Sequence, residues 1–180
     1  MRLKEYDNSW YNTGASFSKR ALWYIVNILV FINPMFPISS FKVYILRLFG
    51  AKIGKGVYIK PSVNIKYPWR LWVGDHVWIG EKVWIDNLDY VILGNNVCIS
   101  QGAMLLCGNH NYKKRGFDLI IKPIHINDGC WIGAKSIVCP GTNMREYSVL
   151  SVGTVVSGDV DAYSIYQGVP GNKIKERVIK

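Results

Sequence analysis

The sequence has few cysteines and no apolar segment long enough to cross a bilayer. None of its four cysteines forms a CxxC pair, which argues against a zinc site or a disulfide framework and favours free thiols in a reducing cytosol. The apolar segment at residues 22–32 is shorter than the roughly 20 residues that a membrane span needs. It begins late and no small-residue cleavage site follows it, so we expect no secretory signal. The cysteines are Cys98, Cys107, Cys130 and Cys139.

Acidic residues are scarce at one end of the chain. The 180 residues carry 22 Lys and Arg against 12 Asp and Glu, a formal net charge of +10. Residues 1–70 hold eleven of the basic residues and two of the acids, so this part carries +9 and residues 71–180 carry +1. A pI near 9.5 first suggests a nucleic-acid partner. The basic residues form no stripe along the later part and no nucleic-acid-binding module is present, so we expect no such partner.

An aliphatic residue recurs every six positions from residue 53 onward. A helix would need a period of 3.6 and a simple strand a period of 2, whereas a fixed period of six indicates a stacked β-helix. Three hexads make one triangular coil of eighteen residues, so sixteen hexads predict about five coils. The repeated positions are Ile53, Ile59, Ile65, Val73, Ile79, Ile85, Leu93, Ile99, Leu105, Ile126, Ile132, Val138, Met144, Leu150, Val156 and Ala162.

Three irregularities interrupt this period. The register slips by two residues before Val73 and again before Leu93, and we expect bulges at the corners of the coil there. Between Leu105 and Ile126 the spacing is 21 instead of six, so an inserted loop occupies about residues 106–125. A long loop inside a regular solenoid points to a functional role.

The chain divides into three parts around these repeats. Residues 1–52 form a basic and apolar segment that is extended and then helical, residues 53–167 form the β-helix, and residues 168–180 form a basic tail. The apolar, aromatic and basic character of the first part leaves two interpretations. It caps an apolar end of the coil, or it lies on an anionic membrane surface as an interfacial anchor.

Turn and capping residues predict where the first helical segments end. The apolar segment at residues 22–32 ends just before two prolines, which stop helices. A second short helix is expected at residues 41–49, with Ser39 or Ser40 as its N-cap and Gly50 at its C-terminal end.

Strand alternation assigns two columns of outward residues that are largely apolar. Contiguous exposed apolar area indicates an interface or a groove. A register error of one residue would turn both columns inward, but Ile, Leu and Val already fill the core positions. The first column reads Tyr58, Trp78, Cys98, Trp131 and Val149, and the second reads Asn64, Trp84, Met104, Ile137 and Val155.

Several motifs together give the chain a strong resemblance to a known family. They are the hexads, the Leu-Leu-Cys-Gly-Asn-His110 step into the loop, the run Trp131-Ile-Gly-Ala-Lys-Ser-Ile-Val-Cys-Pro-Gly141, and the ending Gly168-Val-Pro-Gly171. Over about residues 40–175 the chain resembles hexapeptide-repeat acetyltransferases, and among them the colanic-acid-type exopolysaccharide acetyltransferases. The resemblance implies a left-handed β-helix, a homotrimer with sites between subunits, and acetyl-CoA as donor, without a metal.

His110 is the catalytic residue that the resemblance implies. It lies where the coil passes into the inserted loop, and an imidazole can take a proton from an alcohol near neutral pH. By resemblance it is the general base that activates a sugar hydroxyl for direct attack on the acetyl thioester. Asn109, Tyr112 and Asp86 are candidates for contact with the acceptor. Asp86 could instead orient His110 or be a solvated turn acid. Lys113, Lys114 and Arg115, which follow Tyr112, could meet an anionic or phosphorylated acceptor or form a solvated run of charges.

Donor contacts carry over from the family to seven positions. Trp131 would lie beside the pantetheine arm, although packing in the trimer is its alternative role. Lys175 keeps the positive charge near the 3′-phosphate, and Lys173 could substitute for it. The seven positions are Trp131, Gly133, Ala134, Val152, Ser157, Lys173 and Lys175.

Two functional classes follow from these observations. The first is an O-acetyltransferase that moves an acetyl group from acetyl-CoA to a hydroxyl of a sugar or polysaccharide precursor. The second is a non-catalytic β-helix scaffold that assembles on a membrane surface, because a fold alone does not prove a function. For either class we expect a cytoplasmic protein, free or held peripherally at the inner face of the membrane.

Overall fold

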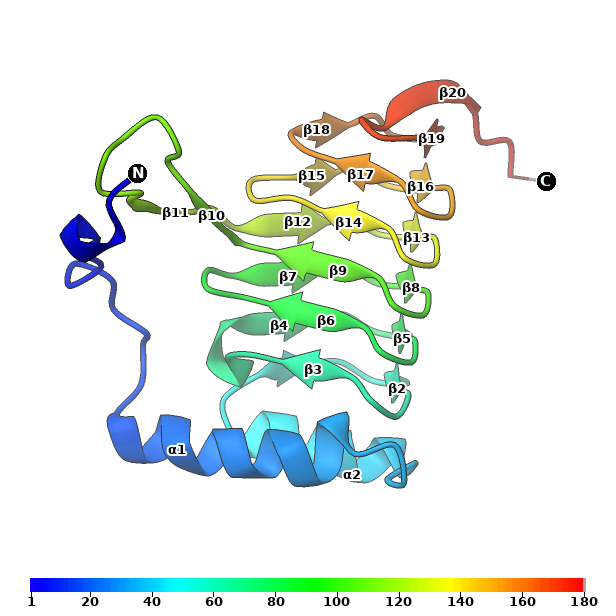
Figure 1. Ribbon diagram of the computed structural model, residues 1–180. Helices are drawn as coiled ribbons and strands as arrows, with labels where there is room; N and C mark the ends of the chain where they lie inside the picture. Colours follow the sequence, from blue (N-terminus) through cyan, green and yellow to red (C-terminus); the bar gives the residue numbers. More distant parts are fainter. Residues whose placement is uncertain (180) are drawn as a thin grey trace.

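The computed structural model describes residues 1–179 and has the predicted left-handed parallel β-helix, closed at one end by helices (Figure 1). The first sheet contains β1 (Lys52–Ile53), β4 (Leu71–Val73), β7 (Val91–Leu93), β12 (Ile124–Ile126), β15 (Asn143–Met144) and β18 (Asp159–Val160). The second contains β2 (Tyr58–Ile59), β5 (Trp78–Ile79), β8 (Cys98–Ile99), β13 (Trp131–Ile132), β16 (Val149–Leu150), β19 (Ser164–Gln167) and β20 (Asn172–Glu176). The third contains β3 (Asn64–Ile65), β6 (Trp84–Asp86), β9 (Met104–Leu106), β14 (Ile137–Val138) and β17 (Val155–Val156).

The hexad residues form the core of this solenoid. On the second sheet, Ile59 is in register with Ile79, Ile79 with Ile99, and Ile99 with Ile132. All four are at most 1% exposed. The six-residue period therefore places one aliphatic side chain inside the coil on each face. The first sheet has six levels, slightly more than the five coils expected.

The corners account for the slips in the period. Ile53 is in register with Val73, and Val73 with Leu93, so the extra residues of the two slips lie in the corners between the strands. The first of these corners contains a 3-10 turn at Pro68–Arg70. The last hexad was predicted wrongly. Val160, not Ala162, is in register with Met144, because the final coil is two residues shorter than a regular one.

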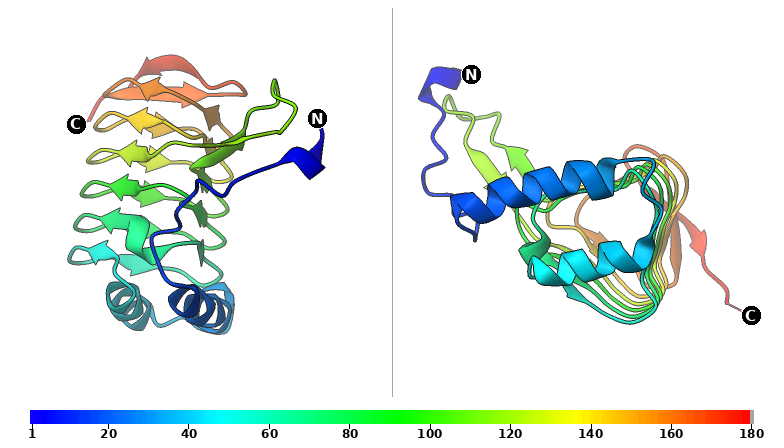
Figure 2. Two further views of the ribbon diagram at one scale, coloured as in Figure 1. Left: turned by 90° about the vertical axis from the view of Figure 1, so that its left-hand side faces the viewer. Right: turned by 90° about the horizontal axis from the view of Figure 1, so that it is seen from below.

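Helices cover the open end of the first coil (Figure 2). They are α1 (Phe17–Val26), a π-helical turn at Asn27–Ile32, and α2 (Ser39–Leu48). Trp23 and Phe31 are buried beneath the coil, and the indole Nε1 of Trp23 donates to the backbone oxygen of Ile65 at 2.9 Å. The apolar segment therefore packs against the coil as a cap.

Polar groups of this cap satisfy the unpaired edge of the lowest strands, which would otherwise be open to pairing. Ser39 was a predicted N-cap of α2, but Ile38 occupies that position. The Ser39 hydroxyl instead accepts from the backbone N–H of Ile59 at 2.8 Å, because no strand lies below β2 to do so. Gly50, with φ +99°, follows the end of α2 as predicted.

The inserted loop and the tail both contain strands. The insertion forms an antiparallel hairpin of β10 (Gly108–His110) and β11 (Leu119–Ile121), which leaves the coil between β9 and β12 (Figure 1). The tail, expected only to be basic, pairs through β20 with β19. A 3-10 turn at Leu3–Glu5 lies near the hairpin, where the N–H of Arg2 donates to the backbone oxygen of Arg115 at 2.8 Å.

The outward columns are exposed or partly exposed, as alternation predicts, with one exception. Tyr58, Trp78, Trp131 and Trp84 are between 40% and 59% exposed. Val149 is a correction, because it is only 6% exposed. Its small side chain lies in the ladder between the larger Trp131 and Ile165, which cover it. Among the helices that the structure describes, none has the length and hydrophobicity needed to cross a bilayer.

Candidate active site

The ring of His110 is fixed by the hairpin on which it lies. Its Nδ1 is 2.9 Å from the backbone oxygen of Phe117. A carbonyl oxygen only accepts, so Nδ1 carries the hydrogen in this contact and the neutral ring keeps its lone pair on Nε2. The Phe117 ring stacks on the imidazole with 4.3 Å between centroids and 4° between planes. The hairpin therefore presents Nε2 of His110 as a proton acceptor.

The turn of the hairpin explains how Phe117 reaches His110. Side-chain oxygens of Asn109 and Asn111 accept from backbone N–H groups one and two residues further on, at 2.7 and 3.1 Å. Such local contacts stabilise tight turns. Phe117 itself has a left-handed backbone with φ +54°. This conformation returns the chain toward β11 with the carbonyl of Phe117 beside the imidazole.

The first residues of the chain form a wall beside His110. The ring of Tyr6 lies 5.6 Å from the imidazole, and the carboxylate of Glu5 lies 3.9 Å from Nε of Arg115 on the hairpin. Further on, the hydroxyl of Tyr11 donates to the backbone oxygen of Leu88 at 2.7 Å. Burial raises the pKa of Tyr11, so its hydroxyl remains a neutral donor.

A cavity of about 370 Å³, here called the His110 cavity, lies between this wall and the coil. Polar and aromatic side chains line it, with two basic residues and no acid among them. The lining residues are Tyr6, Asn8, Tyr11, Thr13, Arg20, Lys66, Tyr67, Leu88, His110 and Leu119.

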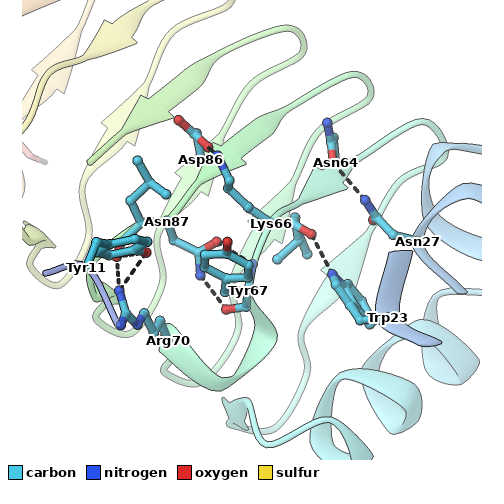
Figure 3. Close-up of polar contacts among 11 residues, drawn as sticks. Tyr11, Trp23, Asn27, Asn64, Lys66, Tyr67, Arg70, Asp86 and Asn87 are labelled. Atoms are coloured by element: carbon cyan, nitrogen blue, oxygen red, sulfur yellow. Dashed lines mark hydrogen bonds and ion pairs between the residues drawn. The ribbon is translucent and has the colours of Figure 1, made fainter. Parts of the chain in front are cut away.

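A second cavity of about 380 Å³, here called the α1 cavity, adjoins the first. It shares Arg20, Lys66 and Tyr67 with the His110 cavity. Nζ of Lys66 is 2.9 Å from Oδ1 of Asp86 (Figure 3). The α1 cavity is lined by Arg20, Trp23, Tyr24, Asn27, Ile32, Asn64, Lys66, Tyr67, Trp84 and Asp86.

A third cavity of about 410 Å³, here called the Trp131 cavity, lies on the second sheet. The floor is flat at Gly133, where a Cβ atom would lie 2.5 Å from the backbone oxygen of Leu150. The indole Nε1 of Trp131 donates to the hydroxyl of Ser100 at 2.9 Å. The cavity is lined by Trp131, Gly133, Val149, Leu150, Ser151, Val152, Ile165, Gln167, Ile174 and Lys175.

The His110 and Trp131 cavities have no lining residue in common. In the view along the coil, the hairpin and the C-terminal strand β20 project from opposite sides of the triangle (Figure 2). One chain therefore does not bring the two cavities together.

Comparison with known proteins places this chain in a family. No protein-family model matches it. The Escherichia coli (strain K12) protein named "Putative colanic acid biosynthesis acetyltransferase WcaF" is 34% identical over 165 residues, which are 92% of this chain and 91% of that protein. The chain belongs to the hexapeptide-repeat acetyltransferases.

Two solved structures share the fold of this acetyltransferase. The hexapeptide-repeat acetyltransferase VCA0836 of Vibrio cholerae, in complex with acetyl-CoA, has a TM-score of 0.81 at 20% identity and covers 92% of each chain. A galactoside acetyltransferase in complex with coenzyme A has a TM-score of 0.77 at 22% identity, covering 88% of this chain and 80% of that one. Both likenesses concern the fold.

The structure of this acetyltransferase brings together four of the seven predicted donor residues. Trp131, Gly133, Val152 and Lys175 line the Trp131 cavity. Ala134, Ser157 and Lys173 are not among its lining residues. Nζ of Lys173 lies 2.7 Å from Glu176 and 3.7 Å from Asp161. The hydrogen bond to Glu176 raises the pKa of Lys173.

The predicted acceptor residues of the acetyltransferase are more scattered. Asp86 lines the α1 cavity and forms an ion pair with Lys66, whereas the group in contact with the His110 ring is the Phe117 carbonyl. Asn109 and Tyr112 line none of the three cavities, and Tyr112 is 78% exposed. Within residues 1–179, no group of three His, Cys, Asp or Glu is arranged to hold a metal ion.

Sequence reasoning missed several residues around His110. Tyr6 and Arg20 reach the site only through the fold, and Phe117 acts through a backbone carbonyl that every residue has. Lys66 and Asp86 are different, because they are twenty residues apart like the core residues just before them, which are in register. That spacing was a usable signal for their ion pair.

Proposed function

We propose that this acetyltransferase moves an acetyl group from acetyl-CoA to a hydroxyl of a sugar or polysaccharide precursor, with His110 as the general base. The observation that carries the proposal is the contact of Nδ1 with the Phe117 carbonyl, which leaves Nε2 of His110 free to accept a proton. The names of the relatives support the acceptor class, since they refer to colanic acid biosynthesis and to a galactoside.

The chemical step needs one proton acceptor on the protein. Nε2 of His110 takes the proton of the acceptor hydroxyl while the hydroxyl oxygen forms a bond to the acetyl carbon. The carbon–sulfur bond breaks, and the thiolate that leaves receives the proton from His110. The Phe117 carbonyl accepts from Nδ1 throughout, so it also stabilises the transient imidazolium.

The Trp131 cavity fits the donor in this proposal. A thin chain can lie close to the backbone at Gly133, where no side chain fits, and the indole of Trp131 forms a side wall. Lys175 supplies a positive charge at the same cavity for a phosphate group. Acetyl-CoA is a substrate in this proposal, and its acetyl group would face His110 of a neighbouring chain.

The proposed assembly is a homotrimer in which the His110 cavity of one chain meets the Trp131 cavity of the next. The separation of the two cavities within one chain supports it. So does the exposed column of Tyr58, Trp78 and Trp131, because contiguous apolar surface is typical of interfaces. Coexpression of His110→Ala with Val152→Trp, which would fill the Trp131 cavity, should restore activity in mixed trimers. Two inactive variants that never complement each other would contradict shared sites.

Replacement of His110 tests the catalytic proposal directly. His110→Ala should lower the acceptor-dependent release of thiol from acetyl-CoA by about 10²- to 10⁴-fold, the usual contribution of a general base. The molecular mass of the assembly should not change. His125→Ala is the matched control, since His125 is exposed on β12 and lines none of the three cavities.

The same assay distinguishes an enzyme from a scaffold. A panel of monosaccharides, nucleotide sugars and lipid-linked sugars is offered with acetyl-CoA. An O-acetyltransferase releases thiol only with an acceptor and loses this activity in His110→Ala. If no acceptor ever increases thiol release, the catalytic proposal is wrong and the non-catalytic β-helix scaffold takes its place.

We also propose that the helical cap contacts the anionic inner face of the cytoplasmic membrane. The cap lies at one end of the coil, and many of its large apolar side chains are exposed (Figure 2). Residues 8–74 contain nine Lys and Arg and no Asp or Glu, a composition that suits anionic lipids. The exposed apolar residues are Phe17, Leu22, Tyr24, Ile25, Ile28, Leu29, Ile32, Met35, Ile38, Phe41, Tyr44 and Leu48.

Sedimentation with vesicles tests this contact. The protein should pellet with vesicles of phosphatidylglycerol and phosphatidylcholine, less so at high salt, and not with phosphatidylcholine alone. Leu29→Glu should abolish pelleting. Val178→Glu, which also replaces an exposed apolar residue with an acid but in the tail, should not. If Leu29→Glu instead halves the mass of the protein without lipid, the cap binds a second copy.

A further inference from the structure

The His110 and α1 cavities form one groove that runs from His110 to the helical cap. They meet at Arg20, Lys66 and Tyr67, which line both. At the far end of the groove lie Tyr24 and Ile32, which are 68% and 38% exposed and belong to the exposed apolar residues of the cap. The groove therefore has a polar end at His110, a basic middle and an apolar end.

Arg20 is the unpaired cation of this groove. No carboxylate lies within 4 Å of it among the described residues 1–179, and its Nε is buried without a hydrogen-bond partner. A buried donor without a partner is unfavourable, so an acceptor atom supplied by a ligand would be favoured there. The planar guanidinium suits the oxygens of a phosphoryl group, which it can bind with two parallel hydrogen bonds.

Lys66 lies on the opposite wall and adds a second positive charge. Its Nζ is 2.9 Å from Asp86, but an ammonium group has three donors, so two remain for a ligand (Figure 3). Arg70, also close by, is already occupied, because its guanidinium donates to Tyr11, Leu88 and Asn12. The cations available in the groove are therefore Arg20 and Lys66.

We propose that Arg20 and Lys66 bind a phosphoryl group of the acceptor, so that the acceptor is a sugar joined to a phosphate or diphosphate. The sugar would occupy the His110 cavity, and whatever the phosphate carries would extend along the α1 cavity past Trp84 toward Tyr24. A diphosphate-linked sugar has two sources, a nucleotide sugar and a lipid-linked sugar. The inference rests on the proposed function, whose acceptor it defines.

The test compares a free sugar with its 1-phosphate, its nucleotide diphosphate and its polyprenyl diphosphate in the acetyl-transfer assay. Arg20→Gln should raise KM for each phosphorylated acceptor by about 10- to 100-fold, the loss expected for a hydrogen bond to a charged group. KM for the free sugar and for acetyl-CoA should not change. Arg20→Lys should recover part of the affinity, and Lys82→Gln at an exposed corner of the coil is the charge-matched control.

A binding measurement accompanies the kinetics. Inorganic pyrophosphate should bind the wild-type protein in calorimetry, and this binding should weaken in Arg20→Gln at unchanged melting temperature. If the free and phosphorylated sugars are used equally well and Arg20→Gln changes neither KM nor pyrophosphate binding, the phosphoryl site is refuted while His110-dependent transfer stands. If His110→Ala keeps full activity, the proposed function fails instead.

The two sources of the phosphoryl group are separated by the apolar end of the groove. Ile32→Glu should raise KM for the polyprenyl diphosphate sugar alone if a hydrocarbon chain lies there. Two results together would assign the α1 cavity to a nucleoside. Ile32→Glu would leave KM for the lipid-linked acceptor unchanged, and the wild-type KM would be lower for the nucleotide sugar than for the lipid-linked acceptor. Both outcomes retain the phosphoryl site at Arg20 and Lys66.

Discussion

Replacing Lys42 with methionine should make the protein more stable at neutral pH. Lys42 is completely buried between α2 and the first coil, where its Nζ donates to the backbone oxygen of Lys60 at 2.9 Å. Burial lowers the pKa of Lys42 from 10.5 to about 8, because the charged amine loses its hydration. The charged form therefore costs free energy in the folded state.

The pKa values set the size and the pH range of this effect. Below pH 8 both the folded and the unfolded protein carry the charge, and the difference in pKa corresponds to about 3 kcal/mol of lost stability. Methionine removes this cost but leaves the oxygen of Lys60 without its donor, at about 1 kcal/mol. The Lys42→Met variant should thus be about 2 kcal/mol more stable at pH 7.

The advantage should disappear as the pH rises. Between pH 8 and 10.5 the unfolded protein holds the Lys42 proton more tightly than the folded protein, so wild-type stability increases with pH. Above this range the neutral amine keeps its hydrogen bond, and the variant should be about 1 kcal/mol less stable than the wild type.

Urea unfolding of the wild type and Lys42→Met at pH 7, 8, 9 and 10 measures this difference. Lys113→Met, at an exposed position of the hairpin turn, is the control for loss of a lysine at each pH. A difference between wild type and Lys42→Met that stays constant from pH 7 to 10 would refute the argument from burial. So would a variant less stable at pH 7.

Three further predictions concern the Trp131 cavity, the tail and the thiols. Gly133→Ala should raise KM for acetyl-CoA about tenfold in steady-state kinetics, because its Cβ would lie 2.5 Å from a backbone oxygen of the next coil. An unchanged KM would place the donor elsewhere. Arg177→Gln removes two hydrogen bonds to backbone carbonyls, and its free energy of urea unfolding should fall by about 2 kcal/mol; equal stability would mean that the tail does not depend on them. Burial raises the pKa of Cys107 to about 12, so mass spectrometry should find it alkylated by iodoacetamide at pH 8 more slowly than the half-buried Cys139. Equal rates would contradict this.

The repeat could be predicted because each of its residues has the same environment. Ile59, Ile79 and Ile99 occupy equivalent positions one coil apart, so the period in the sequence is the period of the structure. The end of the repeat was less predictable. The final coil is two residues shorter than a regular one, so the core position is Val160 and not Ala162, and the period itself carries no sign of this shortening.

The site was only partly predictable for a different reason. His110 was found through its family context, but the group that orients it is the backbone carbonyl of Phe117, which has no signature in a sequence. Arg20 lines the same cavity as His110 because the helical cap lies under the coil. Ser39 was predicted to cap its own helix, whereas its hydroxyl accepts a hydrogen bond from the backbone N–H of Ile59 on the edge strand.

The hairpin that holds His110 interrupts the six-residue repeat without interrupting the ladder of paired strands. Strand β7 pairs directly with β12, and Leu93 is in register with Ile126 as though the coil between them carried no hairpin. The ladder of the first sheet thus accommodates the inserted residues at this point without a change of register. Selection could exchange the hairpin, and with it the preferred acceptor, while the stacking of the solenoid stayed the same.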